Sequence, residues 1–313
     1  MGATVALTGA SGFVGRTVAQ RLLAGRCAVR ALLRRSDADL EDAGVTAVRG
    51  ALEDPSSLER LVAEADVVVH CAGAVKATDA AAFEAVNAEG TARLVAAAAG
   101  AQQRPRFLLI SSLAARQPSV SAYAASKRGA EDALQRGGTD LDWCIVRPPG
   151  VYGPGDRATL PLFRQLDRGV LLAPAVPGAR FSLLHVHDLG GAIEWLLSRP
   201  RWDGSVLEVD DGRHGGYGWS DLADAASRHL GRRVRRIAVP YGVLRLPAAL
   251  NQHLARARGR ASNFTPGKLR ELYHPDWVAR PSSGPLLADW QAEFAFETGF
   301  PATLEWYRRR GWM

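Results

Sequence analysis

The chain has 313 residues, of which 47% are apolar and 23% charged, so it can bury a large core and intrinsic disorder is excluded. No uninterrupted apolar run reaches the roughly 18 residues of a membrane-spanning helix, and no basic-then-apolar leader opens the chain. We therefore expect a soluble, unprocessed protein. Its three cysteines, each in an apolar run, are typical of small buried side chains in a reducing cytoplasm, and they predict neither a disulfide framework nor a metal site.

The net charge of +7 is unevenly distributed. Between Arg228 and Arg270 the sequence carries eleven Lys or Arg residues and no Asp or Glu, and the stretch 240–260 is apolar as well as basic. Such a block suits an anionic substrate, an acidic carrier protein, nucleic acid or a membrane surface, or it is a solvated face. We expect a small-molecule substrate, and the basic block would attract that substrate if it is anionic. We expect no nucleic-acid partner. The sequence does not determine the oligomeric state, and a homodimer is one possibility.

Up to about residue 150, short β-branched runs alternate with Ala/Leu-rich amphipathic segments. This alternation predicts parallel strands joined by crossover helices, and runs covered on both faces form a doubly wound α/β sheet of the Rossmann type. The expected strands are Thr4–Leu7, Ala28–Leu33, Thr46–Arg49, Val67–Cys71, Phe107–Ser111 and Trp143–Arg147. The expected helices are Val14–Ala24, Pro55–Ala65, Ala80–Ala99 and Tyr123–Gln135.

After Arg147 the rhythm changes to Pro/Gly-rich loops, in which Tyr152 and Asp156 are expected, and then to irregular, basic sequence. This change predicts a smaller, mostly C-terminal substrate lobe. We expect residues 1–150 to form the NAD(P)-binding domain, with 181–210 returning to it through a helix at Asp188–Leu197 and a strand at Ser205–Val209. Residues 151–180 and 211–313 would form the substrate-binding lobe.

A glycine-rich segment, Thr8-Gly9-Ala10-Ser11-Gly12-Phe13-Val14-Gly15, lies between the first strand and the first helix. Gly9 allows a tight turn, Gly12 lets the backbone approach a pyrophosphate, and Gly15 lets helix and strand pack closely. The helix N-terminus offers free N–H groups to phosphates. In this position the motif predicts dinucleotide binding by Gly9, Ser11, Gly12, Phe13 and Val14, with a purely structural glycine turn as the alternative.

The second strand ends in Arg34-Arg35-Ser36, where an NAD enzyme carries an acidic residue for the ribose 2′-hydroxyl. A guanidinium there can pair with the 2′-phosphate of NADP, which a carboxylate would repel. We therefore expect NADP to be bound through Arg34. Two alternatives remain. The cofactor could be NAD, and Arg34 and Arg35 could be ordinary surface charges.

Tyr123 and Lys127 are four residues apart, which places a phenol and an ammonium on one face of a helix. A phenol titrates near pH 10, and a nearby ammonium together with an oxidised nicotinamide favours the phenolate. Upstream, Ser111-Ser112 end an apolar strand, where a hydroxyl can polarise a carbonyl while the tyrosine moves the proton. These residues predict proton transfer between Tyr123 and a substrate oxygen.

Several segments jointly resemble one family, the extended short-chain dehydrogenase/reductases, often called NAD-dependent epimerase/dehydratases. The resemblance covers nearly the whole chain. It is carried by the Thr-Gly-x-x-Gly-x-x-Gly opening, Asp54, His70-Cys71-Ala72-Gly73, Val86-Asn87-Ala88-Glu89-Gly90-Thr91, Ser111-Ser112, Tyr123 to Lys127, Arg147 to Asp156, His185-Val186-His187-Asp188 and Glu305-Trp306-Tyr307.

The resemblance implies a catalytic set. Tyr123 would be the acid/base, Ser112 rather than Ser111 would orient the substrate oxygen, and Lys127 would also bond the nicotinamide ribose. Asn87 would support the helix that carries the proton path, or be a packing amide.

The resemblance also implies further cofactor contacts. Asp54 would meet the adenine edge, Ala72 and Gly73 would line the cofactor, and Pro148 would lie near the nicotinamide amide. His185 and His187 would position the returning helix.

Two departures from the family's sugar-modifying members narrow the function. Leu113-Ala114 replace the acidic pair of sugar 4,6-dehydratases, and Pro149-Gly150 replace the aromatic-Asn pair typical of nucleotide-sugar enzymes. We expect an NADP(H)-dependent carbonyl reductase or alcohol dehydrogenase. The alternatives are an epimerase with tightly held NAD(P) and a non-catalytic NAD(P)-binding or sensor protein.

Overall fold

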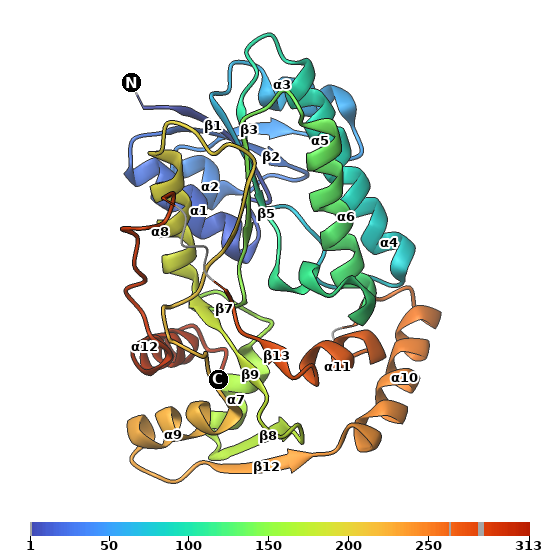
Figure 1. The fold of residues 1–313 in the computed structure, drawn as a ribbon, viewed down its shortest axis with the longest axis vertical. Helices are drawn as coiled ribbons and strands as arrows, with labels where there is room; N and C mark the ends of the chain where they lie inside the picture. Colours follow the sequence, from blue (N-terminus) through green and yellow to red (C-terminus); the bar gives the residue numbers. More distant parts are fainter. Residues whose placement is uncertain (1, 263, 281–284) are drawn as a thin grey trace.

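Seven short runs rich in aliphatic and β-branched residues pair as parallel strands of one sheet, in the spatial order β3-β2-β1-β4-β5-β6-β11 (Figure 1). The structure is a computed structural model that describes residues 2–262, 264–280 and 285–313. Residues 263 and 281–284, which fall in the predicted substrate lobe, lie outside the described residues. The strands are β1 (Thr4–Thr8), β2 (Ala28–Leu33), β3 (Thr46–Arg49), β4 (Val67–His70), β5 (Arg106–Ile110), β6 (Trp143–Arg147) and β11 (Ser205–Glu208).

Helices cover both faces of this sheet, because successive side chains of each strand point to opposite faces and both sets are apolar. On one face, α1 (Phe13–Ala24) and α8 (Val186–Leu197) share a buried core with the strands. On the other, α3 (Pro55–Val62), α5 (Gly90–Gly100) and α6 (Ala122–Gly137) do the same. The Rossmann-type doubly wound sheet predicted from the sequence is therefore confirmed.

Three local expectations need correction. Helix α3 ends at Val62 rather than Ala65, because Ala63 leaves the helical region and Glu64 has a φ of 60°. The helix expected at Ala80–Ala99 is interrupted, with α4 (Ala80–Glu84) followed by a π-helical turn at Ala85–Glu89 before α5. The expected bounds of β2, β3 and β6 are confirmed, and the remaining element ends differ from the expected ones by at most two residues.

Tyr152 is the third correction. The surrounding Pro and Gly residues predict a loop, but Gly150–Tyr152 form a strand, β7, that pairs in parallel with β10 (Leu183–His185). The Tyr152 ring packs against Phe163 and Phe296, so burial of this aromatic side chain prevails over the local turn signals.

Beyond the sheet, a third core gathers aromatic side chains from distant segments, among them Tyr152, Phe163, Tyr217, Phe296 and Tyr307. It is enclosed by α7 (Leu160–Asp167), β8 (Val170–Pro174), α9 (Trp219–Leu230), β12 (Arg235–Val239) and α12 (Phe296–Arg309), beside β9 (Arg180–Phe181), α10 (Tyr241–Ala257), α11 (Pro266–Leu272) and β13 (Asp276–Trp277). The short helix α2 (Ala38–Asp42) joins β2 to β3. Within the described ranges, none of the helices has the length and apolarity needed to cross a membrane.

His70, the last residue of β4, links three elements from a fully buried position. Its Nδ1 lies 2.6 Å from Thr8 Oγ1 of β1, and its Nε2 lies 3.0 Å from Thr91 Oγ1 of α5. Burial, with the nearby charge of Lys127, lowers the pKa of His70 from 6.5 to about 3. Between pH 6.5 and about pH 3, His70 is therefore protonated in the unfolded chain and neutral in the folded chain. This difference lowers the free energy of unfolding as the pH falls from 6.5 toward 3, and above pH 6.5 it has no effect.

We expect His70→Asn to make stability less sensitive to acid. In the wild type, protonation of this one group in the unfolded state should lower the free energy of unfolding by about 2 kcal/mol between pH 7 and pH 5. The variant should lack that part of the loss, because asparagine does not titrate. Urea unfolding of both proteins at the two pH values measures it, and equal losses would contradict the assignment.

Candidate active site

Helix α6 presents Tyr123 and Lys127 one turn apart. Ser121 caps its N-terminus, accepting a hydrogen bond from the Ala124 N–H at 3.0 Å, and the same hydroxyl donates to the Glu271 carboxylate of α11. This cap fixes where the helix begins, and therefore where Tyr123, in its first turn, lies relative to the sheet.

Lys127 is buried against the carboxyl end of β5. Its Nζ donates a hydrogen bond to the Ile110 carbonyl at 2.7 Å. Burial lowers the pKa of Lys127 to about 8, and the charge of Glu131 opposes that shift. A buried cation needs such partners, so the contact fixes α6 against the end of the strand.

Asn87 holds the loop after β4 against the same helix. Its amide nitrogen donates to the Ala74 carbonyl at 3.0 Å and to Ser126 Oγ at 2.8 Å, while its amide oxygen accepts from the Ala74 N–H at 2.7 Å. Asn87 lies in the π-helical turn, which aims its side chain at α6. Its contacts are with protein groups, so we classify it as a positioning residue.

The two serines after β5 have different environments. Ser111 is buried and donates to Glu131, which also binds Arg147 through two hydrogen bonds of 2.9 and 2.6 Å. Ser112 begins a 3₁₀ turn, and its hydroxyl accepts from the Ala114 N–H at 3.2 Å. Interaction with this hydroxyl lowers the pKa of Tyr123. The arrangement therefore supports Ser112, and not Ser111, as the serine that works with Tyr123.

The cation beside Tyr123 is Lys268 of α11, whose Nζ lies 5.8 Å from the centre of the tyrosine ring. Burial raises the pKa of Tyr123 above its usual value, whereas the hydrogen bond with Ser112 and the charge of Lys268 lower it and the charge of Glu271 raises it. The expectation that Lys127 supplies this charge is not met, because its ammonium turns to the Ile110 carbonyl.

Sequence analysis missed Lys268 and its partner Glu271, which accepts from Lys268 Nζ at 2.8 Å. Thr265-Pro266 predicts a helix start, since Thr265 caps α11 and proline suits its first turn. Nothing in the local pattern indicates that this helix packs beside Tyr123, far away in the chain.

The glycine-rich segment fits a dinucleotide. Gly9 has a φ of 76°, and a Cβ there would lie 2.6 Å from the Ala72 nitrogen. A Cβ on Gly15 would lie 2.1 Å from the Gly9 carbonyl oxygen. Helix α1 begins at Phe13 after Gly12 with no side-chain cap, so its first N–H groups remain available to phosphate oxygens.

The other predicted cofactor residues lie at the same edge of the sheet, where the strands end. Exposed Arg34 follows β2, Asp54 precedes α3, Ala72 and Gly73 follow β4, and Pro148 follows β6. Asp54 also caps α3, its Oδ1 accepting from the Ser56 N–H at 3.1 Å. The sheet thus brings the predicted cofactor residues together.

The carboxylates nearest Arg34 are already engaged. Asp37 pairs with Arg16 at 2.5 Å, and Glu41 pairs with Arg49 at 2.9 Å. The edge after β2 therefore presents Arg34 and Arg35 to solvent with no ion pair recorded in the described part of the chain, which is the charge that a 2′-phosphate requires.

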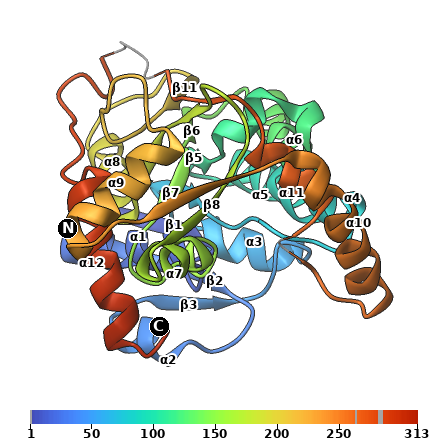
Figure 2. The same cartoon turned by 90° about the horizontal axis from the view of Figure 1, so that it is seen from below.

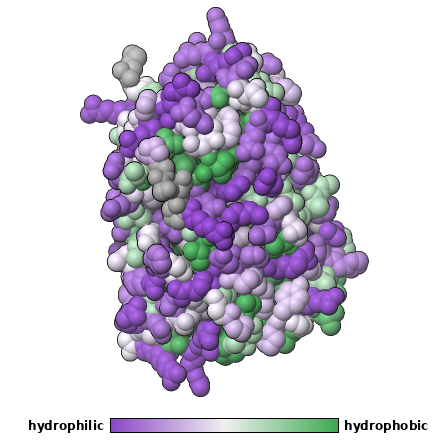
Figure 3. Space-filling model, in the orientation of Figure 1, coloured by the Kyte–Doolittle hydropathy of each residue, from purple (hydrophilic) through white to green (hydrophobic). Residues whose placement is uncertain are grey.

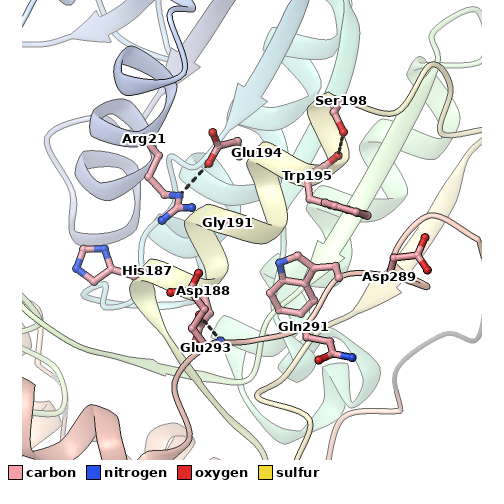
Figure 4. Close-up of a pocket in the computed structure, with 11 residues that line it drawn as sticks. Arg21, His187, Asp188, Gly191, Glu194, Trp195, Ser198, Asp289, Gln291 and Glu293 are labelled. Atoms are coloured by element: carbon pink, nitrogen blue, oxygen red, sulfur yellow. Dashed lines mark hydrogen bonds and ion pairs between the residues drawn. The ribbon is translucent and has the colours of Figure 1, made fainter.

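A cavity of about 430 Å³ lies elsewhere, between α1, α8 and the segment 289–293 (Figure 4). Its lining includes His187 and the ion pair of Arg21 with Glu194, but none of the predicted site residues. His185, beside it, is buried against Tyr152 and Phe294. These contacts agree with the expectation that the two histidines position α8.

This chain is similar to a family of nucleotide-binding proteins, to two reductases and to a solved structure. Residues 9–162 match the family model described as NAD(P)H-binding. The ceramide reductase of Caulobacter vibrioides (strain NA1000 / CB15N) is 38% identical over 311 residues, which cover 99% of this chain and 96% of that protein. The 2-alkyl-3-oxoalkanoate reductase of Shewanella oneidensis is 30% identical over 66% of this chain and 61% of that protein. The solved structure of MoeE5 with UDP-glucuronic acid and NAD has a TM-score of 0.73 at 20% identity, over 98% of this chain and 99% of that one, which is a likeness of fold.

We expect Lys268→Gln to raise the pKa of Tyr123. The substitution removes the ammonium that favours the phenolate and leaves the Glu271 carboxylate, which disfavours it. Titration of tyrosine labelled at the ring carbon that bears the hydroxyl, followed by NMR, measures the midpoint for this residue. Arg270→Gln removes the same charge from the same helix and is the control. An unchanged midpoint, or the same shift in both variants, would exclude the role given to Lys268.

Proposed function

This chain belongs to the extended short-chain dehydrogenase/reductases, and from that premise we propose that it uses NADPH to reduce a ketone on a long-chain lipid of the ceramide class. The observation that carries the proposal is the 38% identity to a ceramide reductase over 99% of this chain. A second relative is a reductase whose name specifies an alkyl-substituted 3-oxo acid, which is a ketone beside a hydrocarbon chain. Whatever its substrate, the chain is an oxidoreductase with a nicotinamide cofactor.

The reductase is favoured over the two alternatives on separate grounds. The neighbours that bind nucleotide sugars share the fold at about one fifth identity, and the full-length relative is a reductase. A sensor protein needs no acid/base pair, whereas here Ser112 lowers the pKa of Tyr123 and Lys127 lies one helical turn from Tyr123.

In the proposed reaction, the ketone, NADPH and a proton give the alcohol and NADP⁺. Ser112 donates a hydrogen bond to the ketone oxygen and so polarises the carbonyl. Tyr123 transfers its phenolic proton to that oxygen as negative charge develops there. The bound nicotinamide supplies the hydride that the carbonyl carbon receives.

Other residues of the chain hold this arrangement. Lys127 fixes α6 against β5 and faces Gly73, where it can reach the ribose of the cofactor. The free N–H groups of α1 hold the pyrophosphate and Arg34 holds the 2′-phosphate. The charge of Lys268 stabilises the phenolate that forms when Tyr123 gives up its proton, so it favours proton transfer to the substrate oxygen.

We expect Arg34→Asp to weaken NADPH binding by about 2 kcal/mol or more and to leave NADH binding unchanged or improved, because a carboxylate repels only the 2′-phosphate. Fluorescence titration with both cofactors measures this. Arg35→Asp is the matched control, and it should weaken NADPH binding far less. Equal weakening of both cofactors by Arg34→Asp would rule out this assignment.

We expect Tyr123→Phe to abolish most turnover and keep cofactor binding. The change removes one oxygen and retains the ring, so kcat should fall by about 100-fold or more while NADPH affinity changes less than about threefold. The assay follows NADPH oxidation with a keto-ceramide in detergent micelles. Tyr241→Phe makes the same change away from the site and should leave kcat unaltered. Wild-type turnover in Tyr123→Phe would refute the proton-transfer role.

A further inference from the structure

Helix α10 carries its large aliphatic side chains on the outside. Val243, Leu246, Leu250 and Leu254 are 61, 76, 61 and 43% exposed, and their spacing places them on one stripe. The opposite face, toward the protein, holds Ala248, which is buried, and half-buried Asn251. A helix that packs only within its own domain has the reverse arrangement.

The stripe lies at the edge of the molecule. Figures 1 and 2 show α10 beyond α11 at the periphery, and α11 is the element against which it mainly packs. In Figure 3, apolar surface reaches the lower right edge, where Figure 1 places α10. No other element of the described ranges covers the four side chains, since each is exposed.

Arginines are frequent in α10 and in the segments that precede and follow it. Strand β12 leads through Pro240 directly into α10, and the basic block identified in the sequence runs through both elements. Nine of its arginines are exposed and have no ion pair recorded within the described residues; they are Arg232, Arg233, Arg235, Arg236, Arg245, Arg256, Arg258, Arg260 and Arg270. An exposed apolar stripe on a helix that lies within a strongly basic stretch of the chain complements an interface of hydrocarbon and anionic groups.

We propose that α10 and its flanking arginines dock the protein on a membrane surface that contains anionic phospholipids. The stripe from Val243 to Leu254 would enter the headgroup–acyl boundary, and the arginines would lie among the phosphates. A second copy of the chain is a poorer occupant, because the same unpaired arginines would face one another. An acidic protein would match the charge, but it would also need a groove to receive a projecting stripe.

The docking surface adjoins the candidate active site. Near the end of α10, the Arg256 Nε donates to the Thr78 carbonyl at 2.8 Å, in the loop that Asn87 holds at Ala74. Exposed Val75 lies in the same loop. After α10 the chain continues to α11, which brings Lys268 to Tyr123. If the proposed lipid substrate is correct, it reaches the site from the face that contacts the membrane.

The test is sedimentation of the full-length protein with vesicles of phosphatidylcholine alone or mixed with phosphatidylglycerol. We expect binding to the mixed vesicles, weakened by salt, and little to the neutral ones. Leu250→Glu should lower the affinity for mixed vesicles by about tenfold or more, because it removes one inserted side chain. Gln252→Glu adds the same charge to the same helix away from the stripe, and it should lower the affinity by less than about threefold. NADPH binding by each variant checks that the fold is retained.

Absence of binding to mixed vesicles at low salt would overturn the proposal, and so would equal binding by Leu250→Glu and the wild type. A wild-type dimer that Leu250→Glu dissociates, seen by sedimentation velocity without vesicle binding, would show instead that α10 is a contact between copies. The vesicle assay requires no turnover and the micelle assay requires no bilayer. Failure of one proposal is therefore distinguishable from failure of the other.

Discussion

The arrangement of the candidate active site depends on the hydrogen bond from Lys127 Nζ to the Ile110 carbonyl. A buried ammonium is costly unless it is paired, so this contact determines where α6 lies against the end of β5. The loop after β4 must approach the same point, and Gly73 permits it: a Cβ there would lie 3.2 Å from Asn87 Oδ1 and 3.6 Å from Lys127 Nζ. Asn87 then joins that loop to α6 through Ser126. The position of Tyr123 follows from these two hydrogen bonds and from the close approach of the loop at Gly73.

A second layer of charged side chains connects this centre to the C-terminal part of the chain. Glu131 and Glu208 both pair with Arg147, at 2.6 and 3.8 Å, and Glu208 also pairs with Arg116 at 3.1 Å. Glu208 accepts the Arg280 N–H at 2.7 Å as well, so the ends of β6 and β11 hold the segment that follows β13. On the other face of the sheet, Asp188 accepts the N–H groups of residues 293 and 294. The C-terminal part of the chain is therefore attached at both faces of the sheet, which keeps α11 beside Tyr123.

Sequence predicted the sheet well because each of its strands is an apolar run bounded by turn residues, and because burial on both faces leaves little freedom in their composition. It also predicted roles for Ser112, Tyr123, Lys127 and the glycine-rich turn, because the spacing of these residues follows from local backbone geometry; the roles themselves remain predictions. It did not identify Lys268, because the packing of α11 on α6 is a contact across about half of the chain with no local signal. The basic block was visible in the sequence, but only the structure revealed that Leu246 and Leu250 point outward.

The proposed reaction is a net reduction in which Tyr123 gives the proton and NADPH is consumed. The most direct measurement is a turnover with NADPH carrying deuterium at the transferred position of the nicotinamide, followed by mass spectrometry of the lipid product. We expect one deuterium on the carbon that bears the new hydroxyl, with one NADP⁺ released for each alcohol formed. Product without deuterium, or a substrate inverted at a carbon with no NADPH consumed, would contradict it and favour an epimerase.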